Sequence, residues 1–564
     1  MGILKKTATA IDIFRKDGLT GISKKFELKK HIAETQRSER KWLSENGTIS
    51  DLEAHRVRKE IEGFDRQPLL SVLLPVYNVD EKWLRKCIDS VASQIYENWE
   101  LCVADDRSPK PHIRRVLDEY ARNDTRIKIV YRPDNGHISA ASNSALEIAI
   151  GEFCVLLDND DELSPDALFW VAKEILDRPE TAMIYSDEDM VDDQGKRYSL
   201  KFKPDFSRDL LYSFNLVTHL SAYKTDILRK IDGFRIGIEG SQDYDLALRF
   251  IEQIDEQQIR HIPRILYHWR AIPGSVALSG DEKPYAHERA RTAIRDHFER
   301  AGIVAEVEPT HFNVHRVRYT LQEQLPSVSL ILFNRKGNDE ARAERTWRGL
   351  TEYENFELVF AKHEASISTS LNEAAERSTG AILCFCDENF LPQSKTWLAD
   401  LVGFAVQRKI GAAGGKLISN ASLVIGGAIV LGCDELCNVA HEGFFEDEAG
   451  NLGRNQVIGN YSAVSAGCMA IRRELFLKVN GFNATRLPNA FFDADLCLRL
   501  GKLGLRIVFD PYTEMKSGEG GNTRSKPSDA ERKYFSTAWK SEIDHDPFYN
   551  PNFSEADGRF KLKV

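Results

Sequence analysis

Three aspartates stand at the end of one apolar run, and their spacing suits the binding of a cation. The run GEFCVLL is followed by Asp158, Asp160 and Asp161. Such a run predicts a strand buried on both faces, and ligands of open parallel sheets bind where these strands end. Carboxylates in an Asp-x-Asp arrangement suit Mg²⁺ or Mn²⁺, and such an ion suits a diphosphate. The alternative is a polar turn that caps the helix after Ser164-Pro165.

The neighbouring segments predict the sheet that would position these aspartates. SVLLPVYN, from Ser71, is an apolar strand closed by a turn, and WELCVADDRS is a second strand that ends in Asp105 and Asp106. An amphipathic helical pattern, 83–95, lies between them. A strand, helix, strand unit predicts a parallel sheet with a right-handed crossover.

Two downstream motifs add groups that accept protons or bind metals. Asp243 lies in GSQDYDL, at a predicted helix start, where the helix dipole keeps a carboxylate ionised and able to accept a proton. The alternative for Asp243 is an ordinary N-cap. His268 lies in YHWR, and a packed core histidine is its alternative. The acidic run 187–189 is interpreted as a solvated turn, with a donor or acceptor contact as the alternative.

The order and separation of these motifs resemble the family 2 glycosyltransferases from about residue 70 to residue 309. The motifs are LLPVYN, VADDRS, NGHISAASNSAL, LLDNDDEL, GSQDYDL and YHWR. The resemblance implies a GT-A fold, which is a Rossmann-like nucleotide-binding sheet with an acceptor subdomain. It implies inverting transfer from a nucleotide-sugar donor to a glycan or lipid-linked acceptor. The chain looks most similar to tandem-domain enzymes of O-antigen and other bacterial surface polysaccharides.

The resemblance also implies roles for individual residues. Asp243 is the expected catalytic base, and Asp158 and Asp160 are the expected ligands of Mg²⁺ or Mn²⁺, which His268 approaches. The residues expected to bind the donor nucleotide are Pro75, Tyr77, Asp105, Asp106, Asn135, Asn143 and Asp158. Many relatives carry Arg before the Asn of the NGGISAARN-like stretch. This chain has Ser142 there, so an Arg contact to the donor is not carried over.

Length and composition exclude several classes of protein. The chain has 564 residues, 42% of them hydrophobic, which is enough for several domains. A net charge of -10 argues against a general nucleic-acid binder. The nine cysteines lack metal-binding spacing and fit buried thiols in a reducing compartment, so zinc is not expected. Neither a membrane-spanning apolar stretch nor a signal peptide is evident, which predicts a cytoplasmic protein.

The second half of the chain repeats the first. SVLLPVYN at Ser71 returns as SVSLILFN at Ser327, Gly151 returns as Gly380, and QDYDLALRF returns as FDADLCLRL. Offsets of roughly 230 to 256 residues indicate a duplicated domain and exclude a solenoid unit. The second copy is expected to be degenerate. It carries Lys362-His363 in place of Asp105-Asp106, Cys386-Asp387-Glu388-Asn389 at the Asp-rich turn and Lys516 in place of a histidine, although it keeps Asp493 and Asp495.

The predicted fold class is therefore α/β, with two tandem GT-A domains between a helical N-terminal segment and a C-terminal strap. The expected divisions are a basic amphipathic segment over 1–65, a catalytic GT-A domain over 66–310, a linker over 311–326, a degenerate GT-A-like domain over 327–522 and the strap over 523–564. Paired basic residues among apolar ones in the first segment predict peripheral contact with an anionic membrane at the inner face of the plasma membrane. A solvated helix face is an equal alternative.

Two other functions stay open at this point. One is a bifunctional enzyme in which the second domain adds another sugar. The other is a non-catalytic sugar-binding scaffold of a polysaccharide assembly complex. The complete set Asp158, Asp160 and Asp243 favours catalysis in the first copy.

Overall fold

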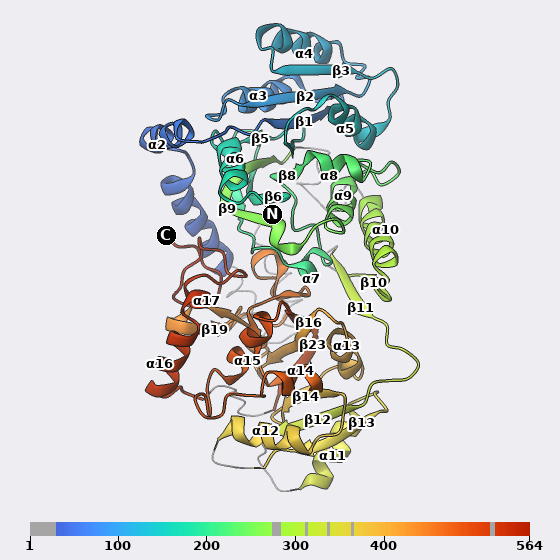
Figure 1. Cartoon of the computed structure of the whole chain (residues 1–564), viewed down its shortest axis with the longest axis vertical. Helices are drawn as coiled ribbons and strands as arrows, with labels where there is room; N and C mark the ends of the chain where they lie inside the picture. Colours follow the sequence, from blue (N-terminus) through green and yellow to red (C-terminus); the bar gives the residue numbers. More distant parts are fainter. Residues whose placement is uncertain (1–29, 273–283, 311–313, 335–338, 363–365, 519–524) are drawn as a thin grey trace, which may run out of the picture.

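The computed structural model describes residues 30–272, 284–310, 314–334, 339–362, 366–518 and 525–564. Two α/β units follow one another along the long axis of the molecule, the first coloured blue to green and the second yellow to red (Figure 1). A helical N-terminal region and a C-terminal segment lie beside their junction, so the predicted fold class is confirmed. Residues 1–29 of the predicted basic segment, and His363, lie outside the described residues.

The first unit is built on a nine-stranded mixed sheet. Its strand order is β3-β2-β1-β4-β8-β6-β9-β5, and β7 pairs with β6. The pairs of β1 with β2 and β4, of β2 with β3 and of β6 with β9 are parallel. The strands are β1 (Leu70–Val76), β2 (Trp99–Asp105), β3 (Ile127–Tyr131), β4 (Phe153–Leu156), β5 (Glu162–Leu163), β6 (Met183–Val191), β7 (Arg197–Lys201), β8 (Ser221–Lys224) and β9 (Ile259–Arg270).

Helices of the first unit pack on this sheet through apolar faces, and α3 (Glu81–Ala92) is an example. In α3 the buried residues Leu84, Cys87, Ile88 and Val91 recur at helical spacing. The strand β1 between the helical layers is buried along its whole length, as expected for a parallel strand covered on both faces. The other helices are α2 (Asp51–Glu62), α4 (Pro111–Asn123), α5 (His137–Ile148), α6 (Ala167–Asp177), α7 (Arg208–Leu211), α8 (Thr225–Lys230), α9 (Gln242–Phe250) and α10 (Pro284–Ala301).

The sheet of the second unit repeats the strand order of the first, without the edge strand that corresponds to β3. Its order is β13-β12-β14-β22-β16-β23-β15, with β17 beside β16 and β20 beside β23. Its strands are β12 (Val328–Phe333), β13 (Phe356–Phe360), β14 (Ile382–Asp387), β15 (Phe390–Pro392), β16 (Ile410–Ile418), β17 (Val424–Gly426), β20 (Gly459–Asn460), β22 (Cys468–Arg472) and β23 (Arg506–Ser517). Its helices are α11 (Glu340–Gly349), α12 (Ile367–Arg377), α13 (Trp397–Ala405), α14 (Arg473–Lys478) and α15 (Phe492–Gly501).

The missing edge strand corresponds to β3. In the first unit, residues 106–136 connect β2 to α5 and contain α4 and β3. In the second unit, residues 361–366 alone connect β13 to α12. The second copy has therefore lost the αβ unit that borders the end of β2, where nucleotide contacts were predicted.

Buried polar contacts recur in both units and show which positions correspond. Ser71 donates to Glu100 at 2.6 Å and accepts from the amide of Gly151 at 2.8 Å. Ser329 makes the same two contacts, to Glu357 at 2.6 Å and from the amide of Gly380 at 2.8 Å. The structure therefore aligns Ser71 with Ser329 and not with Ser327, so the predicted alignment of the two motifs was two residues out.

Small elements and the C-terminal segment join the units. The hairpin of β10 (Ala305–Pro309) and β11 (His315–Tyr319) lies between them, and β11 falls within the predicted linker. A second small sheet orders its strands β19-β18-β21. These strands are β18 (Ala428–Leu431), β19 (Cys437–Val439) and β21 (Ala463–Val464), and the C-terminal helices are α16 (Asp529–Ala538) and α17 (Lys540–Asp544).

Aromatic residues of the C-terminal segment anchor it, as the strap interpretation requires. Phe535, Trp539 and Tyr549 are buried in the core of the second unit. Phe553 packs on Phe202 of the first unit, with ring centroids 5.7 Å apart. The segment thus contacts both units. Among the described residues, none of the helices combines the length and apolar character needed to span a membrane.

Candidate active site

The Asp-rich turn lies between β4 and β5, beside the end of β1. Asn159 donates to the carbonyl of Pro75 at 2.8 Å, which holds the turn against β1. Asp161 is buried and accepts from the Tyr267 hydroxyl at 2.6 Å and the Arg270 amide at 2.7 Å. Burial and the neighbouring charges of Asp160 and Asp158 raise the pKa of Asp161 well above its usual range. Crowded carboxylates of this kind fit the binding of a cation.

His219 completes a compact group that is able to hold a metal ion. The ligand atoms of Asp158, Asp161 and His219 lie within 4.8 Å of one another. Nε2 of His219 is 3.9 Å from Oδ2 of Asp158, and the ring stacks on Tyr267 with centroids 4.5 Å apart. His219 has a φ of 39°, so its backbone is strained and the surrounding contacts must hold it in place. Sequence reasoning missed His219, because an isolated histidine in a loop carries no pattern.

The acidic run of β6 holds three histidines. Nε2 of His261 lies 2.9 Å from Asp187, Nδ1 of His219 lies 3.1 Å from Glu188, and Nδ1 of His268 lies 2.7 Å from Asp189. All three acids are buried, so their interpretation as a solvated turn is wrong. The register between β6 and β9 shifts on both sides of Asp187. Such bulges re-aim side chains that would otherwise alternate between the faces of the sheet.

The compact group shares only Asp158 with the predicted metal ligands Asp158, Asp160 and His268. His268 lies on β9, opposite Glu162 of β5, and its Nδ1 is engaged by Asp189. The backbone carbonyl of Asp160 accepts from Arg270 at 2.7 Å. A carboxylate on one ring nitrogen is the usual support of a metal-binding histidine, since it fixes the ring and presents the other nitrogen. Both His219 and His268 have this support.

Asp243 lies in the first turn of α9, and its environment favours a base. Ser241 is the N-cap of this helix, so the alternative of Asp243 as an N-cap is not what the structure shows. Oδ2 of Asp243 accepts from Asn215 at 2.9 Å. Burial raises the pKa of Asp243 above its usual range, and the nearby charge of His219 works against this shift. A carboxylate with a raised pKa is a stronger proton acceptor than an exposed one.

One pocket brings these groups together. It lies at the ends of β1 and β4, and Asp158, His219 and Asp243 line it. Of the predicted site residues, Pro75, Asp158 and Asp243 line this pocket, together with both polar side chains, such as Asn215 and Gln242, and apolar ones. A candidate cation group and a candidate base therefore face the same space.

The predicted nucleotide contacts at the end of β2 are largely engaged with the protein itself. Asp105 is buried and accepts from the amide of Ser108 at 3.2 Å. Asp106 pairs with Arg132 at 2.9 Å, and its carbonyl accepts from Asn135 at 3.0 Å. These contacts shape the loop after β2. Because β2 and β4 both run parallel to β1, this loop and the Asp-rich turn follow the carboxyl ends of strands on the same side of the sheet.

Tyr77 and Asn143 differ from the other predicted residues. Tyr77 is 49% exposed, so its ring is available to a ligand. Asn143 donates to the carbonyl of Phe234 and accepts from its amide, both at 2.8 Å. Asn372 makes the same pair of contacts with Phe482 in the second unit. The side chain of Asn143 therefore holds a backbone segment, a role that the second copy retains.

Comparison with known proteins decides the family. The sequence profile described as "Glycosyl transferase family 2" matches residues 71–232. The "Putative colanic acid biosynthesis glycosyl transferase WcaA" of Escherichia coli K12 is 31% identical over 34% of this chain and 68% of that protein. The chain belongs to glycosyl transferase family 2.

Two longer relatives of this family 2 chain align with nearly all of it. The "Uncharacterized protein y4gI" of Sinorhizobium fredii is 36% identical, over 90% of this chain and 60% of that protein. The "O-antigen biosynthesis protein RfbC" of Myxococcus xanthus is 31% identical, over 88% of this chain and 41% of that protein. The chain thus spans 60% and 41% of the lengths of these two relatives.

The described second unit of this family 2 chain lacks most of the candidate metal-binding group. The paired strands place Asp387 at the position of Asp158, Phe390 at that of Asp161 and Gly467 at that of His219. The acidic run of β6 is replaced by Lys416, Leu417 and Ile418 on β16. Asp387 accepts from Asn334 at 2.8 Å. Two of the three candidate ligands, and the acids that support the histidines, are absent from the described second unit.

Two further positions of the second unit carry different chemistry. Asp493 occupies the position of Asp243 and accepts from the amide of Ala466 at 3.2 Å. Lys516 occupies the position of His268, and its ammonium lies 3.0 Å from Ser422 and 3.3 Å from Glu446. A lysine donates where a histidine would bind a metal, which fits the predicted degeneracy.

Proposed function

We propose that this chain is an inverting, metal-dependent glycosyltransferase. It moves a sugar from a nucleotide-sugar donor to a glycan or lipid-linked acceptor during assembly of a bacterial surface polysaccharide. Membership of family 2 supports sugar transfer, and the names of the RfbC and WcaA relatives support the pathway. The observation that carries the proposal is that Asp158, His219 and Asp243 line one and the same pocket.

The proposed chemistry divides between the two sides of this pocket. Asp158, with Asp160 or Asp161 and a histidine, would hold Mg²⁺ or Mn²⁺, which neutralises charge on a leaving diphosphate as a Lewis acid. Asp243 would accept the proton of the acceptor hydroxyl as that oxygen attacks the anomeric carbon. Asn215 keeps the Asp243 carboxylate oriented through its 2.9 Å hydrogen bond. Attack opposite to the leaving group inverts the anomeric centre.

The first unit is the proposed catalytic unit, and the second is proposed to be non-catalytic. The loss of the unit that corresponds to α4 and β3 removes one wall of a nucleotide site. Phe390 and Gly467 supply no ligand where Asp161 and His219 stand in the first unit. Within the described part of the second unit, no candidate cation group accompanies the retained Asp493.

The test uses the 564-residue chain and a panel of UDP-, dTDP- and GDP-sugars. Release of nucleoside diphosphate is followed with Mn²⁺, with Mg²⁺ and with EDTA, and a lipid extract of bacterial membranes supplies the acceptor. We expect turnover that depends on the metal, and a product of opposite anomeric configuration by NMR. Full turnover in EDTA would exclude metal dependence, and retained configuration would exclude direct displacement.

A further inference from the structure

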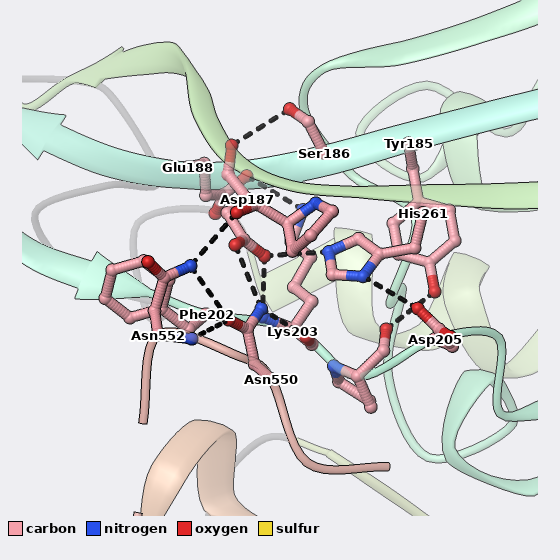
Figure 2. A network of polar contacts seen from close by, with 12 residues as sticks. Tyr185, Ser186, Asp187, Glu188, Phe202, Lys203, Asp205, His261, Asn550 and Asn552 are labelled. Carbon is pink, nitrogen blue, oxygen red and sulfur yellow. Dashed lines mark hydrogen bonds and ion pairs between the residues drawn. The ribbon is translucent and has the colours of Figure 1, made fainter. Parts of the chain in front are cut away.

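The C-terminal segment contacts residues that support the candidate active site without lining its pocket. Residues 545–552 pass beside β6 and β9, where Asn550 and Asn552 reach a buried polar network of the first unit (Figure 2). The labelled residues from the first unit come from β6, β9 and the segment 202–205 that follows β7. The C-terminal segment thus supplies side chains to the first unit from more than two hundred residues away.

Asn550 bridges two buried groups of this network. Its amide nitrogen donates to Oδ2 of Asp187 at 3.0 Å and to the carbonyl of Lys203 at 2.8 Å. Asn550 is 3% exposed, Asp187 is fully buried and Lys203 is 4% exposed. Because these groups are buried from solvent, removal of the Asn550 amide would leave a buried carboxylate and a buried carbonyl with one donor fewer each.

Both partners of Asn550 lead to the strained loop that carries His219. Lys203 donates through its amide to Asp187 at 2.8 Å, and its ammonium donates to the carbonyl of His219 at 2.8 Å and to that of Thr218. The same ammonium lies 3.5 Å from Glu188, which holds Nδ1 of His219. Asn550 is therefore separated from the His219 loop by one residue, Lys203.

The second unit holds the C-terminal segment in this position. Asp546 accepts from the amide of Leu431 at 2.6 Å and from the hydroxyl of Ser462 at 2.7 Å. Arg454 donates to the carbonyl of Phe548 at 2.8 Å. Leu431, Ser462 and Arg454 belong to the second unit. The second unit therefore fixes the part of the C-terminal segment that reaches the first unit.

We infer that Asn550 is a positioning residue for the transferase site, and that the second unit serves catalysis by holding it there. Asn550 fixes Asp187 and the backbone of Lys203, and Lys203 and Glu188 then fix His219 against Asp158. This inference rests on the proposed function of the first unit. It assigns to the degenerate copy and the C-terminal segment a structural part in the active site of the first copy.

The test compares Asn550→Ala with Tyr549→Phe. Tyr549 is the adjacent buried residue, and its hydroxyl contacts the carbonyls of Ser554 and Asp557, at 2.7 and 3.1 Å, and the thiol of Cys433. None of these partners contacts Asp187, Lys203 or His219. Both variants lose buried hydrogen bonds, so both are expected to lower the thermal unfolding midpoint. We expect only Asn550→Ala to raise the Mn²⁺ concentration for half-maximal binding, by about 10-fold or more, because supports of metal ligands usually contribute this much.

Metal-free NMR keeps this test separate from that of the proposed function. The ¹⁵N-histidine signal of His219, assigned by its loss in His219→Gln, should shift in Asn550→Ala and stay unchanged in Tyr549→Phe. If Asn550→Ala does not fold, Asn550→Ser is judged by the same criteria. An unchanged His219 signal together with unchanged Mn²⁺ binding would overturn the inference, whereas metal-independent turnover of the wild type would count against the proposed function alone.

Discussion

Oε2 of Glu188 lies 3.1 Å from Nδ1 of His219. Burial opposes ionisation of Glu188, but Lys201, Lys203 and His219 together hold its pKa well below its usual range. A charged Glu188 orients the imidazole so that Nε2 faces Asp158. The acidic run of β6 therefore works as a row of supports for histidines.

Glu188→Gln should weaken metal binding without removing any candidate ligand. The amide keeps the volume of the side chain but loses the charge that fixes the ring, so we expect Mn²⁺ affinity to fall about 10-fold to 100-fold. Isothermal titration with Mn²⁺ measures this. Glu100→Gln is the matched control, because Glu100 is an equally buried glutamate that pairs with Lys128 away from the pocket. Equal effects of the two substitutions would contradict the role of Glu188.

Asp158→Asn should abolish metal-dependent transfer, and so should Asp160→Ala. Asp158 is the one residue common to the predicted ligands and the compact group. The fold should persist, because Asp158 lies in the turn that follows β4 and not within a strand. The control is Asp387→Asn at the corresponding position of the second unit, which should leave nearly full transfer. Loss of one of two distinct linkages in the product of Asp387→Asn would instead support a two-site enzyme.

Asp243→Asn should lower turnover by roughly 100-fold or more while donor binding persists, because the amide cannot accept a proton. Asp493→Asn is its counterpart in the second unit and should retain activity. Stopped-flow binding of donor, measured beside turnover, separates the two effects. A collapse of donor affinity with normal turnover of bound donor would make Asp243 a binding residue.

The raised pKa of Asp243 gives a further expectation for pH dependence. The base must be ionised, so turnover should fall as the pH drops through a value above that of an ordinary aspartate. Asn215→Ala removes a hydrogen bond to the ionised carboxylate of Asp243 and should therefore raise the pKa of Asp243 further. The fall in turnover at acidic pH should then begin at a higher pH. If turnover falls at the same acidic pH in the wild type and in Asn215→Ala, a group other than Asp243 controls this fall.

The sequence predicted the parts of the fold and site that local pattern determines. β1, β2 and β4 are short apolar runs, and α3 between them has helical spacing, so a parallel sheet with Asp158 at its edge follows from the chain alone. The duplication was visible as well. Its register was not, because serines occur at both 327 and 329, and only the buried contacts with Glu357 and Gly380 distinguish them.

The missed features depend on contacts between distant segments. The acidic run 187–189 has the composition of a turn, and only its pairing with β9 shows that its charges are buried against histidines. His219 acquires its position from a left-handed backbone conformation and from Lys203, neither of which leaves a pattern in the sequence. Asn550 is even more distant, since it reaches Asp187 across 363 positions of the chain.

The basic N-terminal segment should bind anionic vesicles. Its pairs Lys5-Lys6, Arg15-Lys16, Lys24-Lys25 and Lys29-Lys30 alternate with apolar residues. Such a segment gains electrostatic attraction from acidic lipids, which salt screens. Sedimentation with vesicles of phosphatidylglycerol should therefore show binding that weakens with salt and disappears on deletion of residues 1–30. A variant with these basic residues changed to Gln controls for the apolar contribution, and binding that ignores salt would contradict the prediction.

The free energy of unfolding should decrease as the pH rises toward 9, because of His261. Burial lowers the pKa of this histidine, but the charges of Asp187 and Asp205 outweigh burial and raise it to about 9. A folded-state pKa above the unfolded value of about 6.5 means that the stabilisation is complete below pH 6.5 and is lost as the pH rises through 9. The contribution is on the order of 3 kcal/mol, since each pKa unit corresponds to about 1.4 kcal/mol.

Urea unfolding of the wild type and of His261→Gln, at several values between pH 6 and pH 9.5, measures this contribution. The difference in unfolding free energy between them should be largest near pH 6 and shrink at alkaline pH. His441→Gln is the control, because burial lowers the pKa of His441 well below its usual range and keeps that ring neutral throughout. A constant difference for His261→Gln would mean that Asp187 and Asp205 do not hold His261 in its charged form.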